Sequence, residues 1–263
     1  MPTPTNDRQA KIAAASRAQT SPVKLILALV VVIVVVIGVG VTLFMNREDD
    51  GMPGSLPDGK SSPGATLPEM PLPKGVASPT DAIVATNDGK LKDGVPTLTI
   101  FEDFQCPLCK VNEDKYGQKI AEMAKAGKLN VVYYVKTFLD DNLRNDSSVK
   151  AGNAAMCAAN EGKFEAVHDK LFAAQPKEGD GYADSAIEKA GQDAGLTGAA
   201  FDSWKQCVSE KKYSRYLKSV EKHTSDKLKI IGTPAFYLNG QVMKLEGVND
   251  GQAFEAKISE MAK

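Results

Sequence analysis

An uncharged stretch of 21 residues, from 25 to 45, constrains the architecture of this chain more than any other feature. It reads LILALVVVIVVVIGVGVTLFM, and as a helix it would span roughly 30 Å, the hydrocarbon thickness of a bilayer. A core helix rarely runs this long without a polar face, and a signal peptide has a shorter apolar core that ends at a small-residue cleavage site. Because this stretch ends TLFMNREDD, without such a site, it predicts one uncleaved transmembrane helix over residues 24–45.

The charges beside this stretch predict its orientation. Four basic residues precede it against a single acidic residue, whereas three acidic residues directly follow Arg47. Basic residues tend to stay on the cytoplasmic side of a membrane. We therefore expect residues 1–23 to form a short cytoplasmic tail. The rest of the chain would then lie outside the cytoplasm, anchored to the cell membrane by a single pass.

The next segment, residues 46–80, contains seven prolines and five glycines and shows no apolar period. Such a segment buries too little apolar surface to offset the entropy lost on ordering it, so it predicts a flexible linker. Residues 81–263 then form one folded domain by size. The chain has a net charge of −1 and no concentrated basic segment, so we expect no nucleic-acid partner.

The folded region begins with a strand, a helix and a second strand. PTLTIF at 96–101 places apolar residues at alternate positions, as strands do. A helical pattern runs from Pro107 to Gly127, and its apolar face comprises Val111, Tyr116, Ile120 and Met123. LNVVYYVKTF at 129–138 is a nearly continuous apolar run, typical of a strand covered on both faces. Together these segments predict a right-handed parallel βαβ unit.

A mainly helical region follows, over about residues 145–228. The pattern then returns to strands, AFYL at 235–238 and QVMKL at 241–245. The Asn-Gly pair between them suits the type I′ turn of a hairpin. Apolar residues at 254, 258 and 261 predict a closing helix. We therefore expect an α/β domain whose helical insertion separates a βαβ unit from a ββα unit.

Two of the four cysteines carry the clearest chemical signal. Cys106 and Cys109 lie where the first strand gives way to a helix. A thiol at a helix start lies against unpaired backbone N–H groups and the positive end of the helix dipole, and both favour the thiolate. The Cys106 thiolate would attack a disulfide and form a mixed disulfide, which Cys109, one turn away, would resolve.

Two other interpretations of this cysteine pair stay open. It could be half of a zinc site, although the other two cysteines and the two histidines lack ligand spacing, so we expect no metal. It could also be a purely structural disulfide. The position between a strand and a helix favours the redox interpretation.

Five segments, taken together and in order, resemble the DsbA-like thiol–disulfide oxidoreductases: DFQCPLC, GKFEAVHDKLF, AGQDAGL, FDSWKQC and IIGTPAFYLNG. The resemblance covers about residues 95–263 and implies a thioredoxin-like fold with an inserted helical subdomain. It also implies an enzyme whose only cofactor is its own Cys106–Cys109 disulfide. The membrane-tethered layout is similar to that of extracytoplasmic members in Gram-positive bacteria.

The resemblance assigns roles to the residues beside the cysteines. The cis-proline of the family maps onto Pro234 and would leave the backbone of Thr233 free to pair with a substrate strand. The Thr-Pro step by itself favours an ordinary trans turn. Pro107 and Leu108, between the cysteines, would tune the couple. Many strong oxidases of the family have histidine in place of Leu108, so we expect weaker thiolate stabilisation and weaker oxidising power here.

Thioredoxin-fold relatives often carry a buried acid six residues before the first cysteine, and this chain has Ile100 there. Glu102 and Asp103 lie close by, and they would either relay the proton of Cys109 or be merely solvated. His168 lies on an apolar helical face, so we expect it to be a core histidine.

Cys157 and Cys207 lie in separate helical patterns of the insertion. Outside the cytoplasm such a pair is expected to form a disulfide. The alternative is two free thiols that act as small buried hydrophobes. We predict a structural disulfide that joins two helices of the insertion and takes no part in turnover.

These features predict an extracytoplasmic thiol–disulfide oxidoreductase that forms or exchanges disulfides in exported cysteine-containing polypeptides and is reset by a membrane redox partner. A disulfide reductase or isomerase in the same location is an alternative. A membrane-tethered peptide-binding or assembly factor, with only structural disulfides, is an alternative from a different class. The reduction potential of the Cys106–Cys109 pair separates the first two, and activity after loss of Cys106 separates an enzyme from a binding factor.

Overall fold

The computed structural model describes residues 70–85 and 89–263. The predicted tail, the transmembrane helix and residues 46–69 of the linker lie outside the described residues. Within the described ranges, no helix is both long and apolar enough to span a bilayer. Residues 70–80, which we assigned to the linker, instead run along the domain, where Met70, Leu72 and Val76 pack against the hydrophobic core.

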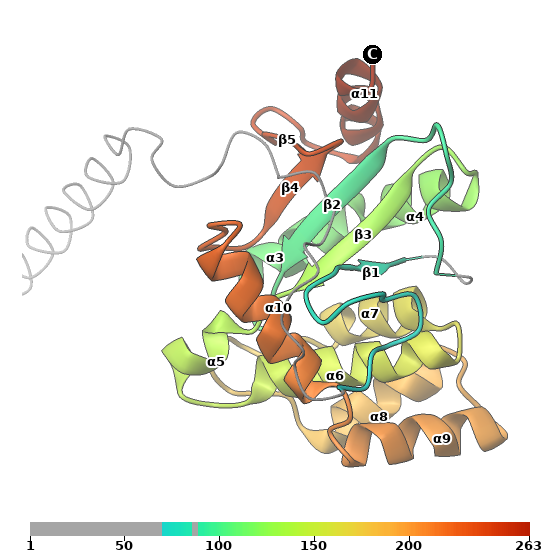
Figure 1. Ribbon diagram of the computed structural model, residues 1–263, viewed down its shortest axis with the longest axis vertical. Coiled ribbons are helices and arrows are strands. Elements are labelled where there is room, and N and C mark those ends of the chain that lie inside the picture. Colours follow the sequence, from blue (N-terminus) through green and yellow to red (C-terminus); the bar gives the residue numbers. More distant parts are fainter. Residues whose placement is uncertain (1–69, 86–88) are drawn as a thin grey trace, which may run out of the picture. The chain divides into compact units, whose positions relative to one another are not determined.

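A five-stranded sheet lies at the centre of the described region (Figure 1). Its strands are β1 (Ile83–Val84), β2 (Thr97–Glu102), β3 (Asn130–Val135), β4 (Ala235–Leu238) and β5 (Gln241–Val242). Their order across the sheet is β1-β3-β2-β4-β5. β2 and β3 pair in parallel and the other neighbours pair antiparallel, which confirms the predicted βαβ unit. The two central strands are buried.

The chain between β2 and β3 forms α3 (Pro107–Asn112), the π-helical turn η1 (Glu113–Gly117) and α4 (Gln118–Lys125). Pro107 is the first residue of α3, a position whose N–H has no partner within the helix, so proline loses no hydrogen bond there. The helical run ends before Gly127, whose φ is 70°. The predicted helix is thus confirmed, but the placement of Val111 on its apolar face is wrong, because that side chain is exposed. Val111 lies about 200° around the helix from the buried Cys109.

The chain between β3 and β4 is helical, as predicted. Its helices are α5 (Phe138–Leu143), α6 (Ser147–Asn160), α7 (Phe164–Ala173), α8 (Asp184–Asp193), α9 (Gly198–Ser209) and α10 (Ser214–Asp226). The strand expected over 129–138 ends earlier, at Val135. The Thr137 carbonyl already accepts a hydrogen bond from the Asp140 N–H (3.1 Å), which begins a helical turn.

The last part of the sheet is the predicted hairpin. Asn239 and Gly240 both have left-handed backbone angles, with φ of 50° and 79°, as a type I′ turn requires. β5 is shorter than the predicted strand over 241–245. The closing helix, α11 (Gly251–Met261), begins at Asp250, whose carboxylate accepts a hydrogen bond from the Ala253 N–H (2.8 Å).

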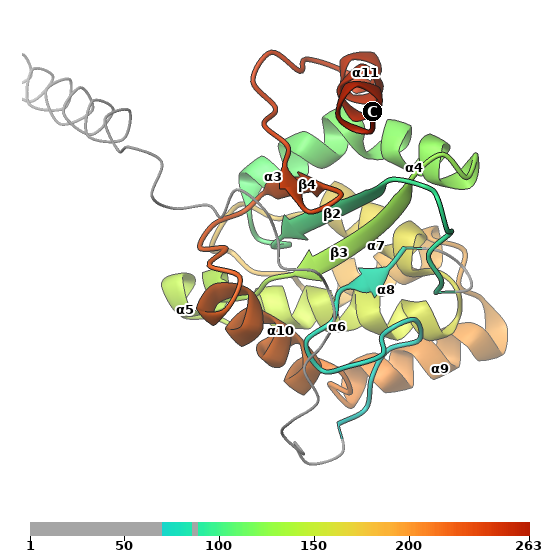
Figure 2. The ribbon, with the colours of Figure 1, turned by 45° about the horizontal axis from the view of Figure 1, so that its top comes forward.

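In the views of Figures 1 and 2, α6, α8, α9 and α10 of the insertion lie below the sheet, whereas α4 and α11 lie near each other at its upper end. A disulfide joins Cys157 of α6 to Cys207 of α9, with a Cα–Cα distance of 5.8 Å. This confirms the predicted structural bridge over the alternative of two free thiols. Beside it, the Trp204 indole donates a hydrogen bond to the Ala154 carbonyl (2.9 Å), so the same two helices are also joined by a buried polar contact.

Candidate active site

Cys106 lies at the junction between β2 and α3. It caps the helix in an extended conformation, with φ −75° and ψ 118°, and Pro107 follows at the first helical position. Several hydrogen bonds fix its backbone, two of them with residues outside α3. The Cys106 N–H donates to the Asp103 carbonyl (2.9 Å), and the Gln175 side-chain amide donates to the Cys106 carbonyl (3.0 Å). Because Gln175 lies two residues after the end of α7, the helical insertion supports the loop that presents the thiol.

The segment before β4 approaches this thiol from the other side. In its protonated form the Cys106 thiol donates to the Thr233 carbonyl, with an Sγ···O distance of 3.4 Å, although 127 positions separate the two residues. The Thr233–Pro234 peptide bond is cis, as the family resemblance implies. Cys106 and Cys109 are both free and both buried. The structure therefore brings the two cysteines, Thr233 and Pro234 into one site.

The two thiols differ in acidity because their surroundings differ. A hydrogen bond from Cys109 lowers the pKa of Cys106 to about 6, against the opposing effect of burial. The Thr233 side chain and the backbone N–H groups of Cys109 and Leu108 lower the same pKa further. Burial raises the pKa of Cys109 well above its ordinary value. At neutral pH the pair therefore consists of one thiolate, Cys106, and one protonated thiol, Cys109.

A small pocket lies beside Cys109 and has room for about one water molecule. Residues of β2, α3, η1, α4 and the start of β4 border it. The lining comprises Ile100, Glu102, Cys109, Asn112, Glu113, Ile120, Pro234 and Phe236. Ile100, at the position where relatives often have an acid, is apolar, but Glu102 and Glu113 each place a carboxyl group at this pocket.

Glu102 is buried and paired rather than solvated. Its Oε1 lies 2.7 Å from Nε2 of His168 on α7. The His168 ring is also buried, among aromatic side chains that include Phe104 and Tyr133, which confirms the expected core histidine. Burial lowers the pKa of His168, but the Glu102 and Asp169 carboxylates outweigh burial and raise it well above 6.5. The pair is thus a buried imidazolium and carboxylate.

Asp103 is fully buried, so the solvated alternative is wrong for it as well. One carboxylate oxygen accepts hydrogen bonds from the Gln105 N–H (2.9 Å) and the Ser148 hydroxyl (2.5 Å). The other accepts from the Leu139 N–H (3.3 Å). Burial raises the pKa of Asp103 to about 7 in spite of these bonds. Asp103 therefore ties the loop before Cys106 to α5 and α6.

Two residues of the site were missed from the sequence. Glu113 lies four residues after Cys109, on the same helical face, and this spacing was a usable signal. Gln175 holds the carbonyls of Phe104 (2.8 Å) and Cys106 (3.0 Å), but no local pattern marks it, because its contacts are 71 and 69 positions away.

Comparison with known proteins agrees with this geometry. The model of the family described as thioredoxin matches residues 92–258, well over half of the chain. DsbA from Mycobacterium tuberculosis, in its oxidised form, is 25% identical over 69% of this chain and 93% of its own, with a TM-score of 0.56. The chain is a DsbA-like member of the thioredoxin family. Its enzyme class is accordingly that of the protein thiol–disulfide oxidoreductases.

Two further structures share the fold of this DsbA-like protein at lower identity. MdbA, a thiol-disulfide oxidoreductase from Actinomyces oris, is 17% identical over 64% of this chain and 80% of its own, with a TM-score of 0.56. Oxidised BdbD from Bacillus subtilis is 21% identical over 69% of this chain and 98% of its own, with a TM-score of 0.52. No curated protein matches the chain.

DsbA-like proteins use a cysteine disulfide rather than an external cofactor. Among the described residues, Glu113, His168 and Asp169 come close enough to be considered as metal ligands. Both ring nitrogens of His168, however, already have carboxylate partners, Nε2 in Glu102 (2.7 Å) and Nδ1 in Asp169 (3.2 Å). The cluster is therefore a network of contacts between His168 and the Glu102 and Asp169 carboxylates.

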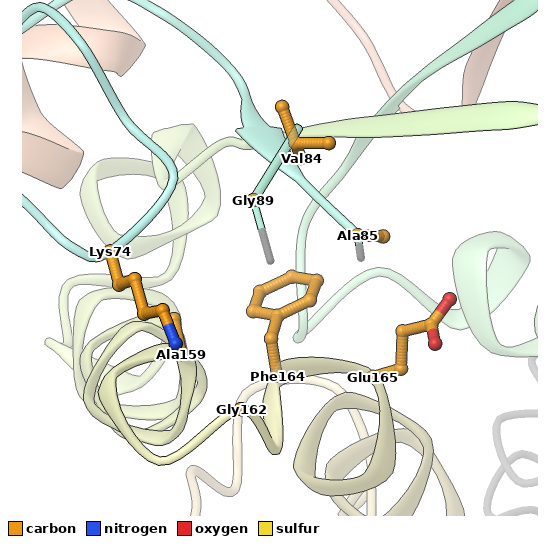
Figure 3. A pocket seen from close by; sticks show the side chains of 8 residues that line it. All are labelled: Lys74, Val84, Ala85, Gly89, Ala159, Gly162, Phe164 and Glu165. Carbon is orange, nitrogen blue, oxygen red and sulfur yellow. The ribbon is translucent and has the colours of Figure 1, made fainter. Parts of the chain in front are cut away.

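A second small pocket of the DsbA-like domain lies between the segments around β1 and the start of α7 (Figure 3). The Phe164 ring stands at its centre, with Lys74 and Glu165 on opposite sides. Neither active-site cysteine lines it. It offers no group with redox or acid–base chemistry beyond these two surface charges, so the pocket beside Cys109 is the better candidate.

Large apolar side chains are exposed mainly beside the cysteines. Of the four that are exposed in the described part of the chain, Leu108, Val111 and Ile231 lie on α3 or just before Thr233, and the fourth is Leu91. Leu108 and Ile231 are the most exposed, at 62% and 71%. The surface next to the Cys106 thiol is therefore apolar and uncovered.

Proposed function

We propose that this protein forms or exchanges disulfides in exported polypeptides, outside the cytoplasm, through a Cys106–Cys109 redox couple. The observation that carries the proposal is the arrangement of the two thiols. Cys106 has a lowered pKa and faces the Thr233 carbonyl, while Cys109 is buried one turn behind it. This arrangement supplies one nucleophilic sulfur and one resolving sulfur within reach of each other.

In the oxidising direction, a substrate thiolate attacks Sγ of Cys106 in the disulfide form. The Cys106–Cys109 bond breaks, and its electron pair moves to Cys109, which is then protonated. A second substrate thiolate attacks the substrate sulfur of the mixed disulfide, and Cys106 leaves as a thiolate. The low pKa of Cys106 makes it a good leaving group in this last step.

The surface beside Cys106 supports polypeptides as the substrate class. The backbone of Thr233 would pair with an extended substrate segment, as strands do when they add to an exposed edge. Leu108 and Ile231 would contact its apolar side chains. Unfolded polypeptides expose both an unpaired backbone and apolar residues, whereas small thiols offer neither.

The uncharged stretch over 25–45 and the basic residues before it support an anchored protein whose catalytic domain lies outside the cytoplasm. A protease added to intact cells should then cut the linker and release the domain. If the domain is protected in intact cells but cut after lysis, the orientation is reversed. A membrane redox partner would reset the couple after each turnover.

Trapping of mixed disulfides tests the roles of the two cysteines. Cys109→Ala removes the resolving thiol, so this variant should accumulate disulfide-linked adducts with exported proteins through Cys106. Cys106→Ala should form none, and it is the matched control. Absence of adducts in both variants would favour a binding or assembly factor with only structural disulfides.

The redox state of the couple in cells tests the direction of electron flow. An oxidase should be found mainly with the Cys106–Cys109 disulfide formed, and a reductase or isomerase mainly with both thiols free. Alkylation of free thiols before lysis, followed by mass analysis of the Cys106 peptide, distinguishes the two states. A mainly reduced protein would replace the proposed oxidase role with the reductase or isomerase alternative.

A further inference from the structure

The proton of Cys109 has no obvious acceptor at the position where thioredoxin-fold relatives often carry an acid. Burial keeps the Cys109 thiol protonated at neutral pH, so every opening or closing of the disulfide must move a proton to or from it. Ile100 occupies the usual position of the acid. The candidate acceptors beside Cys109 are the carboxyl groups of Glu102, Asp103 and Glu113.

Glu102 and Asp103, which the sequence singled out, are both committed to structural contacts. Glu102 forms the buried ion pair with His168 at 2.7 Å. Asp103 accepts three hydrogen bonds, and its carboxylate is no part of the lining of the pocket beside Cys109. Proton uptake by Glu102 would remove its ion pair with His168, and Asp103 has no free face toward the pocket through which a proton could pass.

Glu113 is placed differently. It lines the same pocket as Cys109, and it is half-buried rather than enclosed. No group within residues 70–85 and 89–263 donates a hydrogen bond to its carboxylate. It opens the π-helical turn, and its carboxyl group lies over Gly117, where a side chain would collide with it. Such π-helical turns occur frequently at functional sites.

We propose that Glu113 is the group that exchanges a proton with Cys109, through the pocket that both residues line. This inference rests on the proposed function of the Cys106–Cys109 couple. The pocket has room for about one water molecule, and one bridging water is enough for general acid–base transfer. Because Glu113 itself is half-buried and not enclosed, the proton can then pass from its carboxyl group to solvent.

The chemical steps balance in both directions. When the disulfide opens, the electron pair of the S–S bond moves to Cys109, which takes a proton from the Glu113 carboxyl and leaves a carboxylate. When the disulfide closes, the Glu113 carboxylate takes the Cys109 proton. The Cys109 thiolate then attacks Cys106 of a mixed disulfide, the new S–S bond forms, and the partner sulfur leaves as a thiolate. Electrons pass only between sulfur atoms.

The charges around Glu113 suit this exchange. Burial raises the pKa of Glu113 to about 7, and the protonated His168 of α7 partly opposes that effect. Asp169 of α7, Glu102 of β2 and Asp114 of η1 raise the same pKa. Tyr133 of β3 also faces this group, but its own pKa is raised well above 10, so it stays neutral. Glu113 therefore changes its protonation near neutral pH, as an acid–base catalyst should.

The test compares Glu113→Gln with Asp114→Asn. Both variants remove one acidic charge from the same helical turn, but Asp114 is exposed and pairs with Lys110 (3.1 Å) rather than lining the pocket. Reduced protein is mixed with glutathione disulfide, and two rates are measured by rapid quenching. The first is the rate at which Cys106 attacks glutathione disulfide, which depends on the glutathione disulfide concentration. The second is the rate at which Cys109 attacks the mixed disulfide and closes the Cys106–Cys109 bond, which does not depend on that concentration.

In the wild-type protein the closure rate should rise with pH through an inflection near 7. Asp114→Asn should keep this inflection at a slightly lower pH, because it removes one charge that raises the pKa of Glu113. In Glu113→Gln the inflection should vanish and closure near neutral pH should be roughly tenfold slower or more, a modest share of general-base catalysis. The rate of attack by Cys106 should stay nearly unchanged, which shows that the fold is intact. Glu113→Asp should restore part of the rate and of the inflection.

Three results would overturn the inference. An unchanged closure rate and pH profile in Glu113→Gln would show that another group takes the proton. Equal loss of both rates would show that Glu113 only supports the structure. Failure of the wild-type protein to react with glutathione disulfide at all would remove the proposed redox couple itself, and with it the role of Glu113.

Discussion

Cys106 and Cys109 lie one helical turn apart, yet their surroundings give them opposite protonation at neutral pH. Cys106 faces hydrogen-bond donors, and its pKa falls to about 6, whereas burial raises the pKa of Cys109. Whatever stabilises the Cys106 thiolate also stabilises the reduced form of the couple, and so makes the disulfide more oxidising. The side chain between the cysteines is a direct means of changing this balance.

Leu108→His should make the couple more oxidising. Leu108 is exposed beside the thiolate, so an imidazole there could donate an N–H without entering the core. A fall of one unit in the pKa of Cys106 stabilises the reduced form by about 1.4 kcal/mol, which raises the reduction potential by roughly 30 mV. Thiolate absorbance against pH measures the pKa of Cys106, and equilibration with glutathione measures the reduction potential of the couple. Leu108→Ala, which adds no donor, is the control, and an equal potential in both variants would contradict this role of position 108.

Ile231, which precedes the cis-proline segment, should matter for polypeptide substrates and not for small ones. It is the most exposed large apolar residue of the described chain, at 71%. Ile231→Asp places a charge on the apolar surface beside Cys106, so it should raise KM for a cysteine-containing peptide severalfold. The rate with glutathione disulfide should hardly change. Equal effects on both substrates would indicate a disturbed active site instead of a lost contact.

At the scale of elements, the strands and helices that hold the cysteines were predictable from the sequence because local pattern and fold agree there. PTLTIF alternates as a strand should, and Pro107 suits only the first turn of a helix. The errors arose where a local pattern was ambiguous. Val111 was assigned to the buried face because it is apolar, although it lies on the opposite side of α3 from Cys109. The strand ending at Val135 looked longer because Thr137 and Phe138 suit strands as well.

The candidate site was predictable only in part, for a similar reason. Cys106 and Cys109 are marked by their spacing, and Pro234 by its resemblance to the family. Glu102 was correctly placed close to Cys109. Its partner His168 is 66 positions away, so no local sequence pattern predicts their ion pair. Contacts between distant segments, such as that of Gln175 with Cys106, are set by the packing of the insertion and not by any motif.

The disulfide between α6 and α9 should contribute stability but not activity. It closes a loop of about 50 residues, for which chain entropy predicts a stabilisation of about 4 kcal/mol at most. The double variant Cys157→Ala/Cys207→Ala should therefore lower the melting temperature. Its rate of attack by Cys106 on glutathione disulfide should match that of the wild-type protein at a temperature where both are folded. A slower attack without a lower melting temperature would instead give this pair a part in turnover.

At the scale of the whole molecule, several buried ionisable groups connect the active site to the rest of the fold. Asp103 and Glu113 have pKa values raised to about 7, so their contributions to stability are fully present below about pH 4 and are lost as the pH rises through 7. These two groups are present in both redox states. The Cys106 and Cys109 thiols titrate only in the reduced state. Below about pH 9 Cys109 stays protonated in both the folded and the unfolded protein, so a comparison of the two redox states there isolates the contribution of Cys106.

The stability of the reduced protein, relative to the oxidised protein, should rise with pH between about 6 and 9. Folding lowers the pKa of Cys106 from 9.0 to about 6, so within this window the folded protein holds a thiolate and the unfolded chain a thiol. Unfolding then takes up a proton, which makes the reduced state more stable by up to about 1.4 kcal/mol for each pH unit. This gain is lost as the pH falls through 6.

Urea unfolding of both redox forms across this range measures this pH dependence of stability, with mass analysis to confirm that the Cys157–Cys207 bridge stays intact. Cys106→Ser, which lacks this thiol, is the control, and its stability relative to the oxidised wild-type protein should show no such rise with pH. A difference between the redox forms that does not depend on pH would mean that Cys106 keeps an ordinary pKa in the folded protein.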